Sequence, residues 1–87
     1  MKKFIDPFLC NAPRIDIHGV DRTIAVALIK EFIDDYIRID KRILVIVHGK
    51  GEGILKNATH EYLKKDKRVK EYYICNYNDG ETIVILK

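Results

Sequence analysis

The sequence predicts an α/β fold, a two-layer sandwich with the element order β-α-β-α-β-β in which two helices pack on a mixed four-stranded sheet. Two observations carry most of this prediction. Residues 42–47, RILVIV, form an unbroken apolar run with no alternation, which is typical of a strand buried on both faces in the middle of a sheet. Two other segments repeat apolar residues at spacings of three and four, which indicates helices with one buried face. The first follows Asp21 and runs to about residue 39, and the second covers residues 54–65.

The first elements can be placed from local signals. RIDI, residues 14–17, is a short strand with Ile15 and Ile17 on the core face, so that Asp16 and His18 point the other way. Gly19 ends this strand, and the next residues begin the first helix. Asp21 is the expected N-cap of that helix. Its inward face holds Ala25, Leu28, Ile29, Phe32 and Tyr36.

The second half of the chain follows the same logic. The helix over residues 54–65 should turn Leu55, Ala58, Tyr62 and Leu63 inward. Residues 69–77 and 82–87 are predicted to be the last two strands. The NDG between them is expected to form the hairpin turn, because Asp-Gly tolerates positive φ.

Length and composition favour one small soluble domain. The chain has 87 residues, 47% of them hydrophobic and 33% charged, and its net charge is +3. Residues 1–13 hold both prolines and are expected to be a lead-in to a domain over residues 14–87. No signal peptide or apolar run of roughly 20 residues is present, which predicts a cytoplasmic protein with no membrane partner. The basic run KKDKRVK, residues 64–70, is expected to be a solvated helix end.

Two His-Gly pairs should meet in the folded protein. His18-Gly19 follows the first strand and His48-Gly49 follows the second. A strand, crossover helix and strand in one sheet are most often parallel, so both pairs should lie at the same edge. That edge is where ligands bind in open α/β sheets.

The glycines after His48 predict an anion site. Gly49, Gly51 and Gly53 alternate, which frees consecutive backbone N–H groups to face a ligand, and a helix begins directly after them. Lys50 and Lys56 add positive charge. The pattern fits neither the dinucleotide fingerprint nor the P-loop, and a plain strand-to-helix turn is the alternative.

The polar side chains at this edge suit phosphodiester chemistry. Asp16, His18 and His48 would supply a general base, a general acid and an orienting carboxylate. The same three residues with Glu52 could instead hold a metal such as Mg²⁺ or Mn²⁺. His60 is expected to be a surface residue on the polar side of its helix.

Three segments together resemble the Smr domain, the small MutS-related domain. IDIHG matches its L-D-L-H-G pattern with isoleucines in place of the leucines, HGKGEG matches H-G-x-G-x-G, and GETIVIL matches G-x-T-x-V-x-L. The resemblance covers roughly residues 14–87. It implies a sandwich similar to the C-terminal domain of a bacterial translation initiation factor. The chain looks like the stand-alone form of the domain, and an excised fragment of a longer protein is the alternative.

The resemblance also implies binding of nucleic acid, with endonuclease activity that nicks DNA or cleaves RNA. The implied site is Asp16, His18 and His48 for catalysis, with Gly49, Gly51 and Gly53 at the phosphate. A non-catalytic nucleic-acid-binding adaptor is the alternative, and a small-molecule phosphate enzyme is a weaker one. The choice between DNA and RNA, and between monomer and homodimer, stays open at this point.

Overall fold

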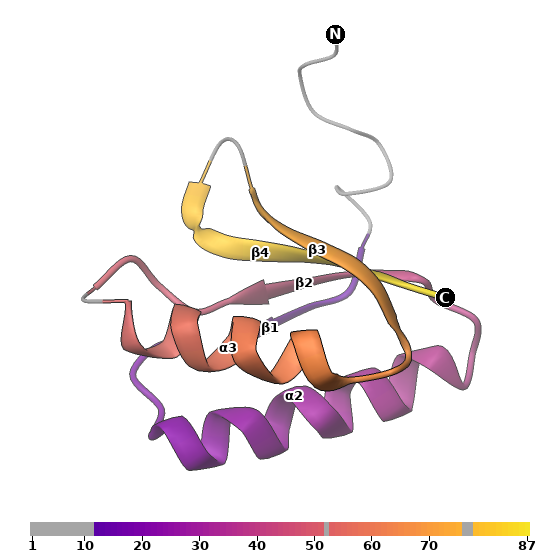
Figure 1. Cartoon of the computed structure of the whole chain (residues 1–87), viewed down its shortest axis with the longest axis horizontal. Coiled ribbons are helices and arrows are strands. Elements are labelled where there is room, and N and C mark those ends of the chain that lie inside the picture. The colour runs from indigo at the N-terminus through magenta and orange to yellow at the C-terminus, as the bar shows by residue number, and fades with distance from the viewer. Residues whose placement is uncertain (1–11, 52, 76–77) are drawn as a thin grey trace, which may run out of the picture.

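The structure is a computed structural model that describes residues 12–51, 53–75 and 78–87. Two helices lie side by side on one face of a four-stranded sheet, which confirms the predicted two-layer α/β sandwich (Figure 1). The elements are β1 (Arg14–Asp16), α2 (Arg22–Ile37), β2 (Ile43–Val47), α3 (Ile54–Lys65), β3 (Val69–Cys75) and β4 (Asn78–Leu86). The strand order is β1-β2-β4-β3, with β1 parallel to β2 and the other neighbours antiparallel.

Helix α2 begins where the sequence predicted. The carboxylate of Asp21 accepts a hydrogen bond of 2.8 Å from the backbone N–H of Thr23, which satisfies a donor that the first turn leaves free. The helix ends at Ile37, two residues before the expected end. Asp40 then takes a left-handed φ of 65°, which turns the chain toward β2. Neither described helix is long and apolar enough to cross a membrane.

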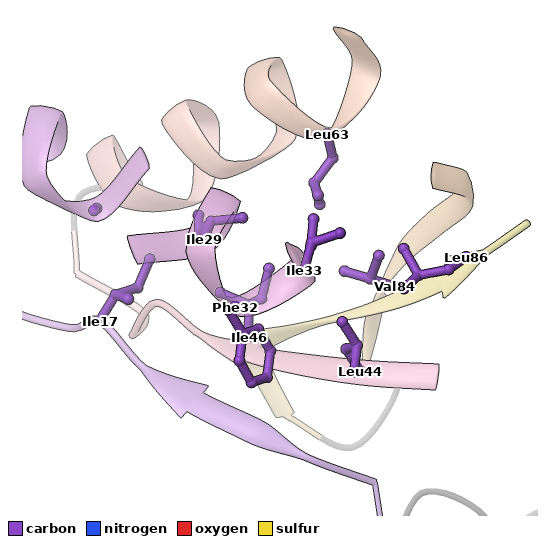
Figure 2. Packing of buried hydrophobic residues seen from close by; sticks show 10 residues of the cluster. Ile17, Ile29, Phe32, Ile33, Leu44, Ile46, Leu63, Val84 and Leu86 are labelled. Atoms are coloured by element: carbon purple, nitrogen blue, oxygen red, sulfur yellow. The ribbon is translucent and has the colours of Figure 1, made fainter. Parts of the chain in front are cut away.

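The core lies between the helices and the sheet (Figure 2). Helix α2 contributes Ile29 and Ile33, helix α3 contributes Leu63, and each of these side chains is at most 1% exposed. Each fully buried side chain of this size is worth about 1.5–3 kcal/mol of transfer free energy. Ile33 was not among the predicted core residues. The other core members are Ile17, Ala25, Phe32, Leu44, Ile46, Val84 and Leu86, with Leu28 and Tyr36 packed at the margin.

Strand β2 is buried on both faces, as its unbroken apolar run predicted. Leu44 and Ile46 face the helices, whereas Val45 points to the opposite face together with its antiparallel neighbour Ile83. Both of these are at most 2% exposed, although the two helices cover only the other face. The strand is therefore fixed in the middle of the sheet, and its carboxyl end is held rigidly.

The predicted hairpin turn at NDG is wrong, because residues 78–80 belong to β4. Asn78 pairs with Cys75 across the hairpin, so the strand begins at Asn78 and not at Thr82. The side chain of Asn78 accepts a hydrogen bond of 2.9 Å from the N–H of Gly80, and the ladder is irregular between Ile74 and Cys75. A local side-chain turn of this kind explains the turn-like composition inside a strand.

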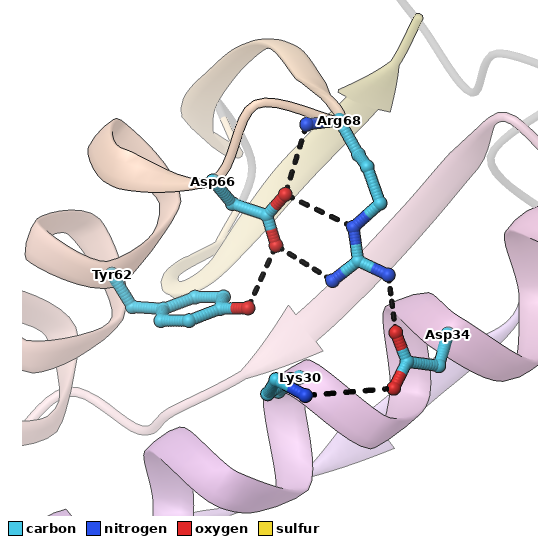
Figure 3. A network of polar contacts seen from close by, with 5 residues as sticks. All are labelled: Lys30, Asp34, Tyr62, Asp66 and Arg68. Carbon is cyan, nitrogen blue, oxygen red and sulfur yellow. Dashed lines mark hydrogen bonds and ion pairs between the residues drawn. The ribbon is translucent and has the colours of Figure 1, made fainter.

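Arg68 joins the C-terminal end of α3 to α2 (Figure 3). Its guanidinium donates to both carboxylate oxygens of Asp66, at 3.0 and 2.8 Å, and also to Asp34 of α2. Tyr62 donates to Asp66 at 2.7 Å. Hydrogen bonds from Arg68 hold the pKa of Asp66 well below its usual range, while burial raises the pKa of Tyr62 to about 12. One cation of the basic run, Arg68, is thus a structural residue.

We predict that Asp66→Asn destabilises the protein in a pH-dependent way. The side chain of Asp66 is 6% exposed, and loss of its charged hydrogen bonds should cost about 2 kcal/mol at neutral pH. Because the folded-state pKa of Asp66 is lowered, its contribution is present above the ordinary value of 3.8 and is lost as the pH falls below it. Urea unfolding of both proteins should therefore show a difference that shrinks from pH 7 to pH 3.

The matched control is Asp35→Asn, which changes an exposed carboxylate on α2. It should leave stability within about 0.5 kcal/mol of the parent at both pH values. An Asp66→Asn penalty that did not change with pH would contradict the assignment of the effect to the carboxylate charge.

Candidate functional site

The two His-Gly pairs lie together at one edge of the sheet. β1 and β2 are parallel, with Asp16 opposite Val47, and the N–H of Ile17 extends the pairing with a 2.8 Å bond to the Val47 carbonyl. The chains then leave the sheet in contact. A Cβ built on Gly49 would lie 3.2 Å from the Cβ of His18, so only glycine allows this approach without movement.

A pocket of about 280 Å³ opens at this edge. It collects residues from three places: the end of β1, the loop after β2, and the first turn of α3. Seven of the eight predicted site residues line it, and the eighth, Asp16, is bonded to one of them. The lining residues are His18, Gly19, His48, Gly49, Lys50, Gly51, Gly53, Ile54, Leu55 and Lys56.

Asp16 and His18 form an exposed acid–imidazole pair. The ring Nδ1 of His18 donates to a carboxylate oxygen of Asp16 at 2.5 Å, and the backbone N–H of His18 donates to the same oxygen at 3.0 Å. These bonds hold the pKa of Asp16 below its ordinary value, with the side-chain bond as the largest cause. The side chains are 68% and 57% exposed for His18 and Asp16. The contact orients the ring through Nδ1, and Nε2 of His18 makes no hydrogen bond within the part of the chain that the structure describes.

His48 has a different environment, because it points into the protein toward the helices. It is 4% exposed, and both ring nitrogens have partners within the chain. Nδ1 lies 3.0 Å from the carbonyl oxygen of Gly49, and Nε2 lies 2.8 Å from the hydroxyl of Thr82 on β4. The predicted catalytic role of this imidazole stays a prediction. What the geometry shows is that His48 holds the backbone of the next residue.

His60 is not the surface residue that we predicted. Its Nε2 lies 2.8 Å from the same Thr82 hydroxyl, and its ring is packed between His48 and Tyr72, with centroid distances of 6.1 and 5.0 Å. Burial, and then the proximity of His48 and Lys56, lower the pKa of His60. The available signal was spacing, since His60 lies three residues before the inward-facing Leu63. Its polar neighbours in the sequence concealed this.

Gly80 supports the loop from β4. Its carbonyl oxygen accepts two backbone hydrogen bonds, from the N–H of His48 at 2.9 Å and from the N–H of Gly49 at 3.0 Å. It also lies so close that a Cβ there would be 3.2 Å from the Gly49 carbonyl carbon and from Cγ of Lys50. The last strand thus determines where the glycine loop can lie.

The amino end of α3 faces the same pocket. Gly53 is the N-cap residue, with a left-handed φ of 85° and no side-chain capping bond. The first intrahelical bond runs from Asn57 to the Gly53 carbonyl at 2.9 Å, so the N–H groups of residues 54–56 precede it. Lys56 lies beside them, half-buried, whereas Lys50 is exposed and lies 3.7 Å from the carboxylate of Asp79. Free N–H groups and a cation at a helix start favour an anion.

Within residues 12–51, 53–75 and 78–87, no three His, Cys, Asp or Glu side chains are grouped closely enough to hold a metal ion. Asp16 and His18 are bonded to each other, and the nitrogens of His48 are occupied. The predicted fourth ligand, Glu52, lies outside the described residues. The metal alternative therefore has no support from the part of the chain that the structure covers.

Comparison with known proteins identifies the family. Residues 15–87 match the family model of the Smr domain. The chain belongs to the Smr domain family. The resemblance carried by IDIHG, HGKGEG and GETIVIL is thereby confirmed. The last of these segments contains Gly80 and Thr82, the two residues that are hydrogen-bonded to His48.

Relatives and solved structures of Smr domains agree with this assignment. The chain is 37% identical over 76 residues to an Endonuclease MutS2 of Finegoldia magna and 40% identical over 77 residues to one of Clostridium botulinum. These matches cover 84% and 85% of the chain but only 10% of each relative. The Smr domain of Thermus thermophilus MutS2 superposes with a TM-score of 0.85 at 26% identity, covering 87% of this chain and 99% of that domain.

A second solved structure supports the fold alone. It is YdaL, a stand-alone small MutS-related protein from Escherichia coli, which superposes with a TM-score of 0.81 at 18% identity. The match covers 85% of this chain and 63% of YdaL. The two-layer arrangement therefore persists where few residues are shared.

We predict that Gly80→Ala disturbs the glycine loop at a distance. The new methyl group would meet the backbone carbon of Gly49 at 3.2 Å, so the loop must move or β4 must shift. The expected cost is about 1–3 kcal/mol of stability, measured by urea unfolding, with the largest amide shift changes at residues 48–51 in NMR spectra.

Gly51→Ala is the matched control, because a Cβ at Gly51 would meet nothing within 4 Å. It places the same methyl group in the glycine loop itself, and it should change stability by less than about 0.5 kcal/mol. Equal effects of the two substitutions would show that loss of glycine flexibility, and not contact with β4, is responsible.

Proposed function

We propose that this Smr domain binds nucleic acid through its phosphate backbone and cleaves a phosphodiester at the pocket. The single observation that carries the proposal is the juxtaposition of two features in one pocket: the His18–Asp16 pair, and the free amino end of α3 with its glycine loop. One supplies a base and the other supplies an anion site. The similarity to proteins named Endonuclease MutS2 supports the same reading.

The proposed chemistry needs one accessible base. The lone pair on Nε2 of His18 removes a proton from a water molecule while the water oxygen forms a bond to phosphorus. The P–O bond to the sugar then breaks, and the leaving oxygen takes a proton from solvent. Asp16 orients the ring and stabilises the imidazolium, and the N–H groups at the start of α3 stabilise the charge on the phosphoryl oxygens.

The site is suited to a polymer backbone because it is open. His18 and Lys50 are both largely exposed, so a chain can pass across the edge of the sheet without an enclosing cavity. Contacts of this kind read phosphates and not base edges, which is compatible with both DNA and RNA.

One observation favours the alternative, a nucleic-acid-binding adaptor without cleavage. Of the two imidazoles expected to share acid and base roles, His48 is buried with both nitrogens occupied. Of the three predicted catalytic side chains, only His18 and Asp16 are exposed enough to meet a substrate. An adaptor would bind nucleic acid at the same edge and would leave it intact.

We predict that His18→Ala removes cleavage and leaves the fold unchanged, because the side chain is exposed and lies outside the core. Supercoiled plasmid and a structured RNA are the substrates, assayed with and without Mg²⁺ or Mn²⁺. Cleavage should fall by at least about 100-fold, in the range expected for loss of a general base. Circular dichroism melts check the fold.

Glu31→Gln, an exposed change on α2, is the control and should retain full cleavage. If the unaltered protein binds both substrates and cleaves neither, the adaptor function replaces the nuclease. If His18→Ala cleaves as well as the parent, the proposed base is wrong.

We also predict that binding depends on which end of α3 carries the charge. Lys56→Gln removes a cation from the pocket, whereas Lys64→Gln removes one from the last turn of the same helix, roughly 12 Å away along the axis. Lys56→Gln should weaken binding and reduce the slope of log K against log salt by about one, and Lys64→Gln should change neither. Equal losses would indicate a diffuse basic surface in place of this pocket.

A further inference from the structure

His48, Thr82 and His60 form a chain of hydrogen bonds between the glycine loop, β4 and α3. Thr82 is fully buried and lies at the centre, with one imidazole nitrogen on either side of its hydroxyl at 2.8 Å. No pattern in the sequence indicates these hydrogen bonds, and the proposed cleavage does not use them. Which group donates in each of these hydrogen bonds follows from the Gly49 carbonyl, which can only accept.

The order starts at Gly49. A carbonyl oxygen can only accept, so the Nδ1 of His48, 3.0 Å away, must carry a proton and donate it. In the neutral imidazole the other nitrogen, Nε2, then has a lone pair and no proton. It must accept from the Thr82 hydroxyl.

The order continues through Thr82 to α3. A hydroxyl group has one proton, and Thr82 has already given it to His48. Its oxygen can therefore only accept from His60, so the Nε2 of His60 is protonated. The direction is thus His60 to Thr82 to His48 to the Gly49 carbonyl, with one proton for each link.

We propose that His60 and Thr82 are positioning residues that hold His48 in its Nδ1–H form, so that the Gly49 carbonyl is kept bonded to the imidazole. This inference rests on the proposed function for its purpose. A carbonyl oxygen in the phosphate pocket would repel the anion. Bonding it to His48, while Gly80 accepts the N–H of Gly49, leaves both polar groups of Gly49 occupied away from the ligand.

Because His48 and Thr82 are buried, the loss of any one of these residues should disrupt the whole series of hydrogen bonds. His48 is 4% exposed and Thr82 is fully buried, so neither can exchange a lost partner for bulk water. The lowered pKa of His60, caused first by burial, favours the neutral ring, whose Nε2–H tautomer supplies the donor to Thr82. The positive charge of Lys56, which also lines the pocket, lowers the pKa of His60 further.

The deciding measurement is the tautomer of His48 in the unaltered protein at neutral pH. Two-bond proton–nitrogen NMR correlations on ¹⁵N-histidine-labelled protein should show a protonated Nδ1 and a bare Nε2 for His48, and the reverse for His60. A His48 ring protonated at Nε2 overturns the proposal, whatever the protein binds.

Paired variants separate positioning from packing. Thr82→Val keeps the shape and removes the hydroxyl, so His48 should lose its fixed tautomer. Thr82→Ser keeps the hydroxyl and should retain the tautomer. On α3, His60→Leu removes the donor and His60→Gln restores an amide N–H. Retention of the Nδ1–H form in Thr82→Val overturns the proposed role of Thr82, and if that variant does not fold, Thr82→Ser and the His60 pair decide.

Binding of a fluorescent structured RNA and of a DNA duplex tests the consequence. Thr82→Val and His60→Leu should weaken binding about five- to tenfold, and Thr82→Ser and His60→Gln should bind within about twofold of the parent. Unchanged binding in Thr82→Val with an altered tautomer would overturn the link to the loop. Absence of binding by the unaltered protein would remove the proposed function, while the tautomer would still decide the proton order.

Discussion

Because β1 and β2 run parallel, both strands leave the sheet at the same edge, and both leave it through a His-Gly pair. The rest of the site depends on this register. A shift of one residue would turn Asp16 and His18 to the opposite face and would place Ile17 in solvent. The apolar residues of the core therefore also position the polar residues at the edge, since Ile17 is buried only when His18 is exposed beside the pocket.

The two histidines that follow the strands have separate tasks in the structure. His18 is exposed and oriented by a carboxylate, which is what a group that meets a substrate needs. His48 is buried and bonded to its own backbone and to β4, which is what a group that maintains a shape needs. Their similarity in the sequence, His-Gly after an apolar run, conceals the fact that one side chain is exposed and the other is buried.

Local signals in the sequence were sufficient for the fold and for the meeting of the two His-Gly pairs at one edge of the sheet. The cap at Asp21, the buried run of β2 and the convergence of the two pairs all depend on short-range pattern or on the handedness of the crossover. The contacts that the sequence did not reveal join distant segments. Thr82 meets His60 because of where α3 lies along the sheet, and no periodicity in α3 or β4 specifies that position. NDG was misplaced because its composition also suits a side-chain turn inside a strand.

The strand order has a consequence for how the site comes into being during synthesis. β4 is the last strand in the chain, yet it occupies an inner position between β2 and β3, and its Gly80 and Thr82 hold the loop that begins at His48. Every residue that lines the pocket has left the ribosome before these two. A nascent chain that displays both His-Gly pairs therefore lacks the support that shapes them, and the pocket takes its form only when β4 inserts between β2 and β3.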